Sequence, residues 1–106
     1  MKRGEIYWMD LGPPAGRRPI LLLSRNAAIP VLAAVIIAPI SRTIRDIASE
    51  VRLGPEQGLP EECAASCDNL LTVPKDKFER SPVGFLDPDK IIELDRALRF
   101  ALEINY

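Results

Sequence analysis

The chain has 106 residues, of which 47% are hydrophobic and 27% are charged, and its formal net charge is −1. These values predict one globular domain over residues 1–106 and exclude a disordered or multidomain chain. Histidine is absent, so the commonest general base and metal ligand is missing, and any chemistry here uses Arg, Lys, carboxylates, hydroxyls or two thiols.

Apolar runs separated by turn residues predict several strands. We expect strands at residues 5–9, 19–24, 31–38, 49–53, 62–66, 69–73 and 83–86. The runs at 19–24 and 31–38 are apolar on both faces, which is typical of central strands, and Pro39 is expected to end the second of them. Gly and Pro predict loops at 10–16 and 54–60, and a short helical turn is expected at 75–78.

One substantial helix is predicted at the C-terminal end. Asp87 suits the N-cap and Pro88 suits the first helical position. Apolar residues then form a stripe at helical spacing, namely Ile91, Leu94, Leu98, Ala101 and Leu102. Strands followed by one helix predict a mainly β, α+β fold, in which a small curled antiparallel sheet is capped by the helix.

No export or membrane segment is visible in the sequence. The basic start at residues 1–3 precedes Gly4-Glu5 rather than an apolar run, and the stretch 29–40 is shorter than the ~20 residues that span a bilayer. We therefore expect a cytoplasmic protein that contacts no membrane. Cys63 and Cys67 alone cannot complete a zinc site, so we predict no metal and two reduced, partly buried thiols.

Charge is distributed unevenly along the chain. Residues 1–52 hold eight basic and four acidic residues, a net +4, whereas residues 53–106 hold six and eleven, a net −5. Such an imbalance can give a weakly acidic protein a basic face suited to a phosphate chain, although charges clustered by chance give the same totals.

Five motifs, in this order, resemble the MazF/PemK toxin family. They are Lys2-Arg3-Gly4-Glu5-Ile6-Tyr7-Trp8, Gly16-Arg17-Arg18-Pro19, Ala38-Pro39-Ile40-Ser41-Arg42-Thr43, Gly58-Leu59-Pro60 and Cys67-Asp68-Asn69. The resemblance covers nearly the whole chain. It implies an SH3-like barrel with a C-terminal helix, a homodimer, and sequence-specific, metal-independent cleavage of single-stranded RNA, restrained by a cognate antitoxin protein. It implies no cofactor.

The resemblance also implies three catalytic residues. Arg18 occupies the place of the family's catalytic arginine, and Ser41 that of a catalytic Thr or Ser. Asp68 matches an aspartate to which an acid–base role is assigned in some members. Here Asp68 is followed by Asn69 and lacks a flanking arginine, and Ser66 stands where some relatives have one. Asp68 is therefore either an acid–base group or a turn residue that binds backbone N–H groups.

The residues themselves suit phosphate chemistry. Arginine keeps its charge at every relevant pH and presents a planar donor fork to phosphate oxygens, and the ring of Pro19 restricts the backbone beside Arg18. Arg17, Arg42 and Thr43 are predicted to contact RNA, with surface positions as the alternative for both arginines. Asn69 is predicted to read a base or to serve the turn.

Two interpretations compete with the nuclease. One is a non-catalytic, CcdB-like toxin that binds DNA gyrase, although the chain ends in residues 103–106 as Glu-Ile-Asn-Tyr rather than Trp-Gly-Ile. The other is an interaction module without activity. Tyr7 and Trp8 can stack on bases, but we expect Trp8 to be buried in the core.

Overall fold

The structure is a computed structural model that describes residues 1–105; Tyr106, part of the C-terminal ending considered above, lies outside the described residues. Strands and helices follow one another as β1 (Glu5–Asp10), β2 (Arg17–Leu22), β3 (Ala34–Ser41), β4 (Glu50–Leu53), the 3₁₀ helix η1 (Pro55–Gln57), β5 (Cys63–Ser66), β6 (Leu71–Pro74), the 3₁₀ helix η2 (Lys75–Lys77), β7 (Gly84–Phe85) and α1 (Pro88–Leu102). Every predicted element is present, but its ends differ from the prediction, most clearly for the strand predicted at 31–38, which is β3 at Ala34–Ser41.

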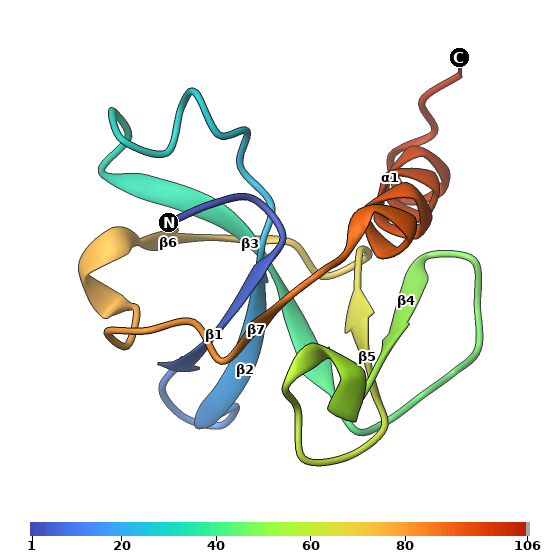
Figure 1. The fold of residues 1–106 in the computed structure, drawn as a ribbon, viewed down its shortest axis with the longest axis horizontal. Helices are drawn as coiled ribbons and strands as arrows, with labels where there is room; N and C mark the ends of the chain where they lie inside the picture. Colours follow the sequence, from blue (N-terminus) through green and yellow to red (C-terminus); the bar gives the residue numbers. More distant parts are fainter. Residues whose placement is uncertain (106) are drawn as a thin grey trace.

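The strands form one curled antiparallel sheet. Their order is β4-β5-β3-β2-β1-β7, and β6 pairs with β3 outside this path. Strand β3 changes its partner on one side along its length: residues 34–37 pair with β6, and residues 40–41 pair with β5. The strands β4 and β5 therefore turn away from β6, and the sheet becomes a half-barrel (Figure 1). The predicted α+β fold is confirmed.

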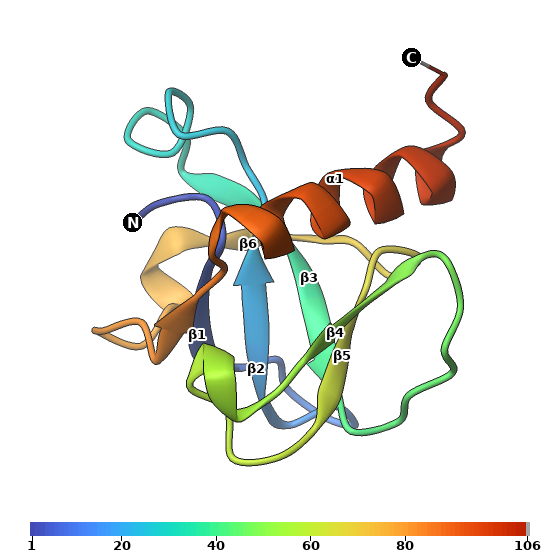
Figure 2. The ribbon, with the colours of Figure 1, turned by 45° about the vertical axis from the view of Figure 1, so that its right-hand side comes forward.

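Helix α1 lies across one side of the half-barrel (Figure 2). Leu94 and Ala97 of α1 are buried there against strand residues such as Ile6 and Leu21. A second cluster, on the other side, contains Tyr7, Met9, Ile20, Leu22, Ile29, Val35 and Ile37. Because β1 and β2 contribute to both clusters, the strands that carry the functional side chains are fixed on both faces.

The start of α1 is as predicted. The Asp87 side chain accepts a hydrogen bond of 2.9 Å from the backbone N–H of Lys90, and Pro88 occupies the first turn. The stripe prediction is wrong at its end: Leu102 is exposed, and Ala97 is buried instead. Leu102 lies in the last turn before Glu103, which ends the helix with a positive φ of 56°.

The predicted strand at 31–38 is wrong at both ends. Val31 is 80% exposed and belongs to a turn, in which the N–H groups of Val31 and Leu32 both donate to the carbonyl of Ala28. Pro39 does not end the strand. It lies between the residues of β3 that pair with β6 and those that pair with β5. Neither pairing therefore needs the backbone N–H that proline lacks.

Both cysteines are free and buried, more completely than the partial burial predicted from the sequence. In residues 1–105 no helix has the length and apolar character needed to cross a membrane.

Candidate functional site

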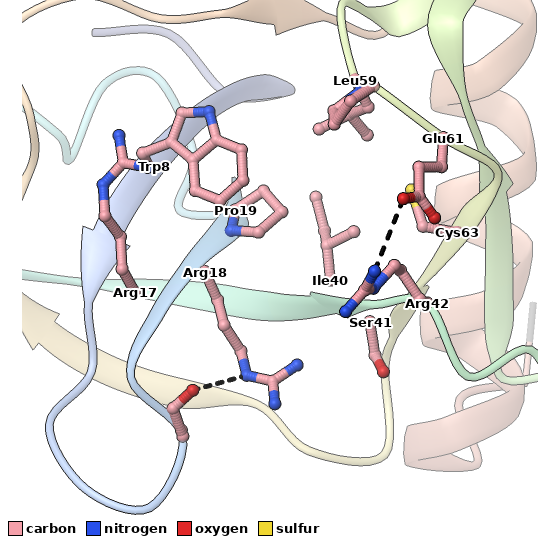
Figure 3. A pocket seen from close by; sticks show the side chains of 12 residues that line it. Trp8, Arg17, Arg18, Pro19, Ile40, Ser41, Arg42, Leu59, Glu61 and Cys63 are labelled. Carbon is pink, nitrogen blue, oxygen red and sulfur yellow. Dashed lines mark hydrogen bonds and ion pairs between the residues drawn. The ribbon is translucent and has the colours of Figure 1, made fainter.

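A cavity of about 310 Å³ opens where β2 begins and β3 ends, beside the segment that precedes β5. We call it the arginine cavity (Figure 3). Its polar lining consists of Arg17, Arg18, Ser41, Arg42, Glu61 and the thiol-bearing Cys63, and its apolar lining includes Trp8, Pro19, Ile40, Leu59 and Pro60. Four of the seven site residues predicted from the sequence therefore meet at one concave surface.

Arg18 is held in the cavity by the loop that precedes β2. Its Nε donates a hydrogen bond of 2.9 Å to the carbonyl oxygen of Ala15, and the side chain is half-buried. Within the described part of the chain neither Nη atom has a partner, and Figure 3 shows the guanidinium directed toward Ser41. Arg18 thus presents an oriented, uncompensated positive charge to the cavity.

Ser41 is the last residue of β3 and pairs with Ala64 of β5. Its Oγ accepts a hydrogen bond of 3.1 Å from the backbone N–H of Thr43. Because a serine hydroxyl is both acceptor and donor, this bond leaves the O–H proton available to a ligand in the cavity. Arg18 and Ser41 together offer a positive charge and a neutral donor.

Arg17 lies at the edge of the arginine cavity with its charge already paired. Its Nε and Nη2 donate to the two carboxylate oxygens of Glu79 at 2.8 and 2.9 Å, and its Cζ lies 4.5 Å from the centre of the Trp8 ring. The hydrogen bond raises the pKa of Arg17 and lowers the pKa of Glu79, so both stay charged. The expectation that Trp8 is a core residue is wrong, because its partly exposed ring contacts Arg17 and lines the cavity.

Arg42 follows Ser41 directly in the chain and is also paired. Its Nη1 is 3.4 Å from Oε1 of Glu61. Cys63 lines the same wall, and burial, followed by the nearby Glu62 and Glu61 carboxylates, raises the pKa of its thiol. The thiol is therefore protonated near neutral pH and is a poor nucleophile.

A second cavity of about 350 Å³ shares Arg18 and Ser41 with the first. We call it the asparagine cavity. Thr43, Arg45, Glu50, Ser66 and Asn69 provide its other polar lining. The Nδ2 of Asn69 donates to the Oγ of Ser66 at 2.9 Å, which fixes the amide at the rim. Thr43 and Asn69, both predicted to contact RNA, are thus brought to the asparagine cavity rather than to the arginine cavity.

Asp68 lines neither cavity. Its Oδ2 accepts a hydrogen bond of 2.5 Å from the hydroxyl of the buried Ser49, and the carbonyl of Ser49 accepts from the N–H of Cys67. These bonds attach the β5–β6 connection to the segment before β4. Asp68 lies in a turn, but its side-chain partner is the Ser49 hydroxyl rather than a backbone N–H, so the expected bonding is not observed. Its acid–base role stays a prediction.

Sequence reasoning missed Glu61, Glu79 and Arg45 as lining or pairing residues. Glu79 is 62 positions from its partner Arg17, so no local spacing signals the pair. Glu61 follows Gly58-Leu59-Pro60, but nothing in that motif indicates a partner in the segment directly after β3. No cluster of three or more metal-ligating side chains occurs among residues 1–105.

Comparison with known proteins places this geometry in a family. Residues 2–102 match the sequence profile described as the PemK-like, MazF-like toxin of type II toxin–antitoxin systems. The chain is 43% identical over 72 residues to a probable endoribonuclease, MazF5, of Mycobacterium tuberculosis, a match that covers 67% of this chain and 65% of MazF5. It is 33% identical to the probable endoribonuclease MazF2 of the same species, over 93% of this chain and 95% of MazF2.

Solved structures agree with the sequence matches. The Mycobacterium tuberculosis toxin MazF-mt6 superposes with a TM-score of 0.88 at 31% identity, over 96% of this chain and 99% of that one. An endoribonuclease in complex with its cognate antitoxin, from a mycobacterial species, gives a TM-score of 0.88 at 30% identity, over 100% and 98%. Because the family profile matches nearly the whole chain and these solved structures share its fold, this protein belongs to the PemK-like, MazF-like family of type II toxins.

Proposed function

We propose that this chain is the endoribonuclease toxin of a type II toxin–antitoxin pair and that it cleaves single-stranded RNA at the arginine cavity. The observation that carries the proposal is the meeting of Arg18, with two unpaired Nη atoms, and the Ser41 hydroxyl in one cavity. The relatives named endoribonuclease MazF5 and MazF2 support the same activity.

RNA supplies its own nucleophile, so the reaction needs neither a metal nor a histidine. The 2′-oxygen attacks the adjacent phosphorus and loses its proton, the bond from phosphorus to the 5′-oxygen breaks, and that oxygen takes up a proton. The products are a 2′,3′-cyclic phosphate and a 5′-OH end. Arg18 stabilises the negative charge that builds up on the phosphorane oxygens, and the Ser41 O–H donates to one of them.

The acceptor of the 2′-OH proton is assigned on weaker grounds than Arg18 and Ser41, because Asp68 lines neither cavity. Asp68 remains the predicted candidate. Only the family resemblance supports it, since its carboxylate is bound to Ser49 and lines neither cavity. A variant of Asp68 that lowers unfolding stability and activity together supports the turn role. One that leaves stability intact and shifts the pH–rate profile supports the acid–base role.

The asparagine cavity suits a base next to the scissile phosphate, because it begins at Arg18 and Ser41 and carries an amide and hydroxyls. Base edges are readable only when the strand is unpaired, so the substrate is single-stranded and cleavage depends on sequence. Thr43 and Asn69 are the residues that we assign to this recognition.

The partners follow from the same proposal. Exposed apolar side chains on α1 (Ile92, Phe100 and Leu102) and near β3 (Val31 and Ile36) support pairing of two copies. An antitoxin protein restrains the activity, as the mycobacterial endoribonuclease solved with its cognate antitoxin suggests. We place the protein in the cytoplasm, where its RNA substrates are found.

The gyrase-binding alternative has no support. The matching family profile is that of PemK-like and MazF-like toxins, and the relatives above are named as endoribonucleases. The structure also gives Arg18 and Ser41 a shared cavity, which a non-catalytic toxin would not require.

The activity is tested with purified protein, a long single-stranded RNA and excess EDTA. We expect cleavage to proceed at an unchanged rate and to leave 2′,3′-cyclic phosphate and 5′-OH ends, detected by end-labelling with and without phosphatase treatment. Products with 5′-phosphate ends, or activity abolished by EDTA, would refute the mechanism. Inhibition of gyrase without RNA cleavage would instead restore the alternative function.

Substitutions at Ser41 test the assigned donor. Ser41→Ala removes one neutral hydrogen bond to the phosphorane and is expected to slow single-turnover cleavage by about 10- to 100-fold, less than loss of a charged donor. Ser41→Thr keeps the hydroxyl and should cleave within a few-fold of the unmodified protein. Inactive Ser41→Thr protein with an unchanged unfolding curve would contradict the hydroxyl's role.

A further inference from the structure

The three arginines that line the arginine cavity differ in how their charges are compensated. Arg17 is paired with both carboxylate oxygens of Glu79 at 2.8 and 2.9 Å, and Arg42 lies 3.4 Å from Glu61. Arg18, between them, has only a carbonyl acceptor on its Nε. A surface with three arginines therefore presents one uncompensated charge.

We propose that Glu61 and Glu79 are specificity-determining residues, which neutralise Arg42 and Arg17 and so limit contact with the RNA backbone in the arginine cavity to Arg18. The inference rests on the proposed endoribonuclease function and extends it. Phosphate contacts hold any RNA equally well, whereas base contacts distinguish one sequence from another. When two phosphate contacts are suppressed, a larger share of the binding free energy comes from base contacts. The time for which an RNA stays bound then depends more on its sequence.

A carboxylate suits this role because arginine binds carboxylate and phosphate oxygens with the same geometry. The guanidinium fork binds either group through two parallel N–H···O bonds, as Arg17 does with Glu79. The Glu79 backbone is itself attached to β1, since its N–H donates to the carbonyl of Trp8 at 3.3 Å. Glu79 is thereby held beside Arg17 rather than meeting it by chance.

Trp8 keeps Arg17 at the cavity whether or not its charge is compensated. The Arg17 Cζ lies 4.5 Å from the ring centre, within the range of a cation–π contact. Removing the Glu79 charge is therefore expected to leave the guanidinium in place and available to a phosphate. Arg42, whose side chain is 79% exposed, needs no rearrangement to reach one.

The test measures RNA binding by Glu61→Gln, Glu79→Gln and the double variant, with Glu93→Gln as the matched control. Glu93 is paired with Lys90 on α1 at 2.8 Å, so its substitution changes net charge equally and frees a cation outside the arginine cavity. The probe is a fluorescent single-stranded RNA of mixed sequence with 2′-O-methyl groups, which lacks the nucleophile and cannot be cut. Kd is measured from 50 to 200 mM NaCl in EDTA.

Each cavity variant is expected to bind the probe about two- to five-fold more tightly than the unmodified protein, the range set by the strength of an exposed ion pair. One added phosphate contact on a single strand steepens the slope of log K against log [NaCl] by about 0.7, so the four-fold rise in salt weakens binding by about 2.6-fold more. For the double variant, with two added contacts, the same rise in salt should weaken binding by about seven-fold more than it does for the unmodified protein.

A second readout concerns cleavage itself. On one long unmodified RNA, mapped by primer extension, the double variant is expected to cut at additional sites that the unmodified protein ignores. Glu93→Gln should reproduce the original cleavage pattern and salt slope. A Glu61 or Glu79 variant that matches Glu93→Gln in slope and pattern, or that binds RNA more weakly, overturns the inference while the nuclease function stands. An unmodified protein that neither binds nor cleaves RNA overturns the proposed function instead.

Discussion

Arg18→Ala is expected to slow single-turnover cleavage of RNA by at least about 100- to 1000-fold, the usual cost of removing one donor to a developing oxyanion. Arg18 is the uncompensated charge in the arginine cavity, since Arg17 and Arg42 are engaged by glutamates. Neither can replace it without breaking an ion pair. The free energy of unfolding should fall by only about 1 kcal/mol, because the folded state loses one hydrogen bond, to the Ala15 carbonyl.

Two further variants complete the test: Arg18→Lys separates the charge of Arg18 from its geometry, and Arg25→Ala is the control. Arg18→Lys keeps the charge but loses the fork that binds Ala15 and phosphate at the same time, so we expect it to recover only a small part of the rate. Arg25→Ala removes an exposed arginine that lines neither cavity and should cleave normally. Urea unfolding and single-turnover rates in EDTA are measured for all three. A rate within ten-fold of normal for Arg18→Ala would remove Arg18 from the reaction.

The fold was largely predictable because its determinants are local. Asp87 and Pro88 mark the start of α1, and alternating or continuous apolar runs mark the strands. The errors arise where tertiary pairing overrides composition. Val31 is apolar but exposed, because no strand pairs with β3 before Ala34 meets Pro74. Pro39 lies within a strand because β3 exchanges one neighbour for another at that point.

The candidate site was predictable only in part, for a similar reason. Arg18 and Ser41 stand in recognisable motifs at the ends of strands, and antiparallel pairing of β2 with β3 brings those ends together. The glutamates that compensate the neighbouring arginines come from segments with no distinctive pattern. Each glutamate neutralises an arginine only because the fold brings the two side chains within 2.8 to 3.4 Å. Motif spacing along the sequence does not predict such contacts. The sequence therefore reveals the positive charges but not which of them are neutralised.

Gly58→Ala is expected to lower the free energy of unfolding by about 3 kcal/mol or more, since it combines a left-handed backbone with a collision. Gly58 has a φ of 86°, and a Cβ at this position would overlap the carbonyl oxygen of Val83, next to β7. This close approach gives a physical reason for the first residue of the Gly58-Leu59-Pro60 motif. Leu59 and Pro60 follow directly and line the arginine cavity, so the close approach of Gly58 to Val83 adjoins one wall of the site.

Gly12→Ala is the matched control, because Gly12 also has a positive φ, 76°, but no atom lies within 4 Å of an added Cβ. It should lose only about 1 kcal/mol, the cost of the left-handed conformation alone. Both variants are unfolded in urea at equal protein concentration, so that any subunit association affects them alike. Equal losses for the two variants would contradict the collision. They would mean that the segment after η1 can move away from β7 at little cost, and that the wall of the cavity is not fixed by that contact.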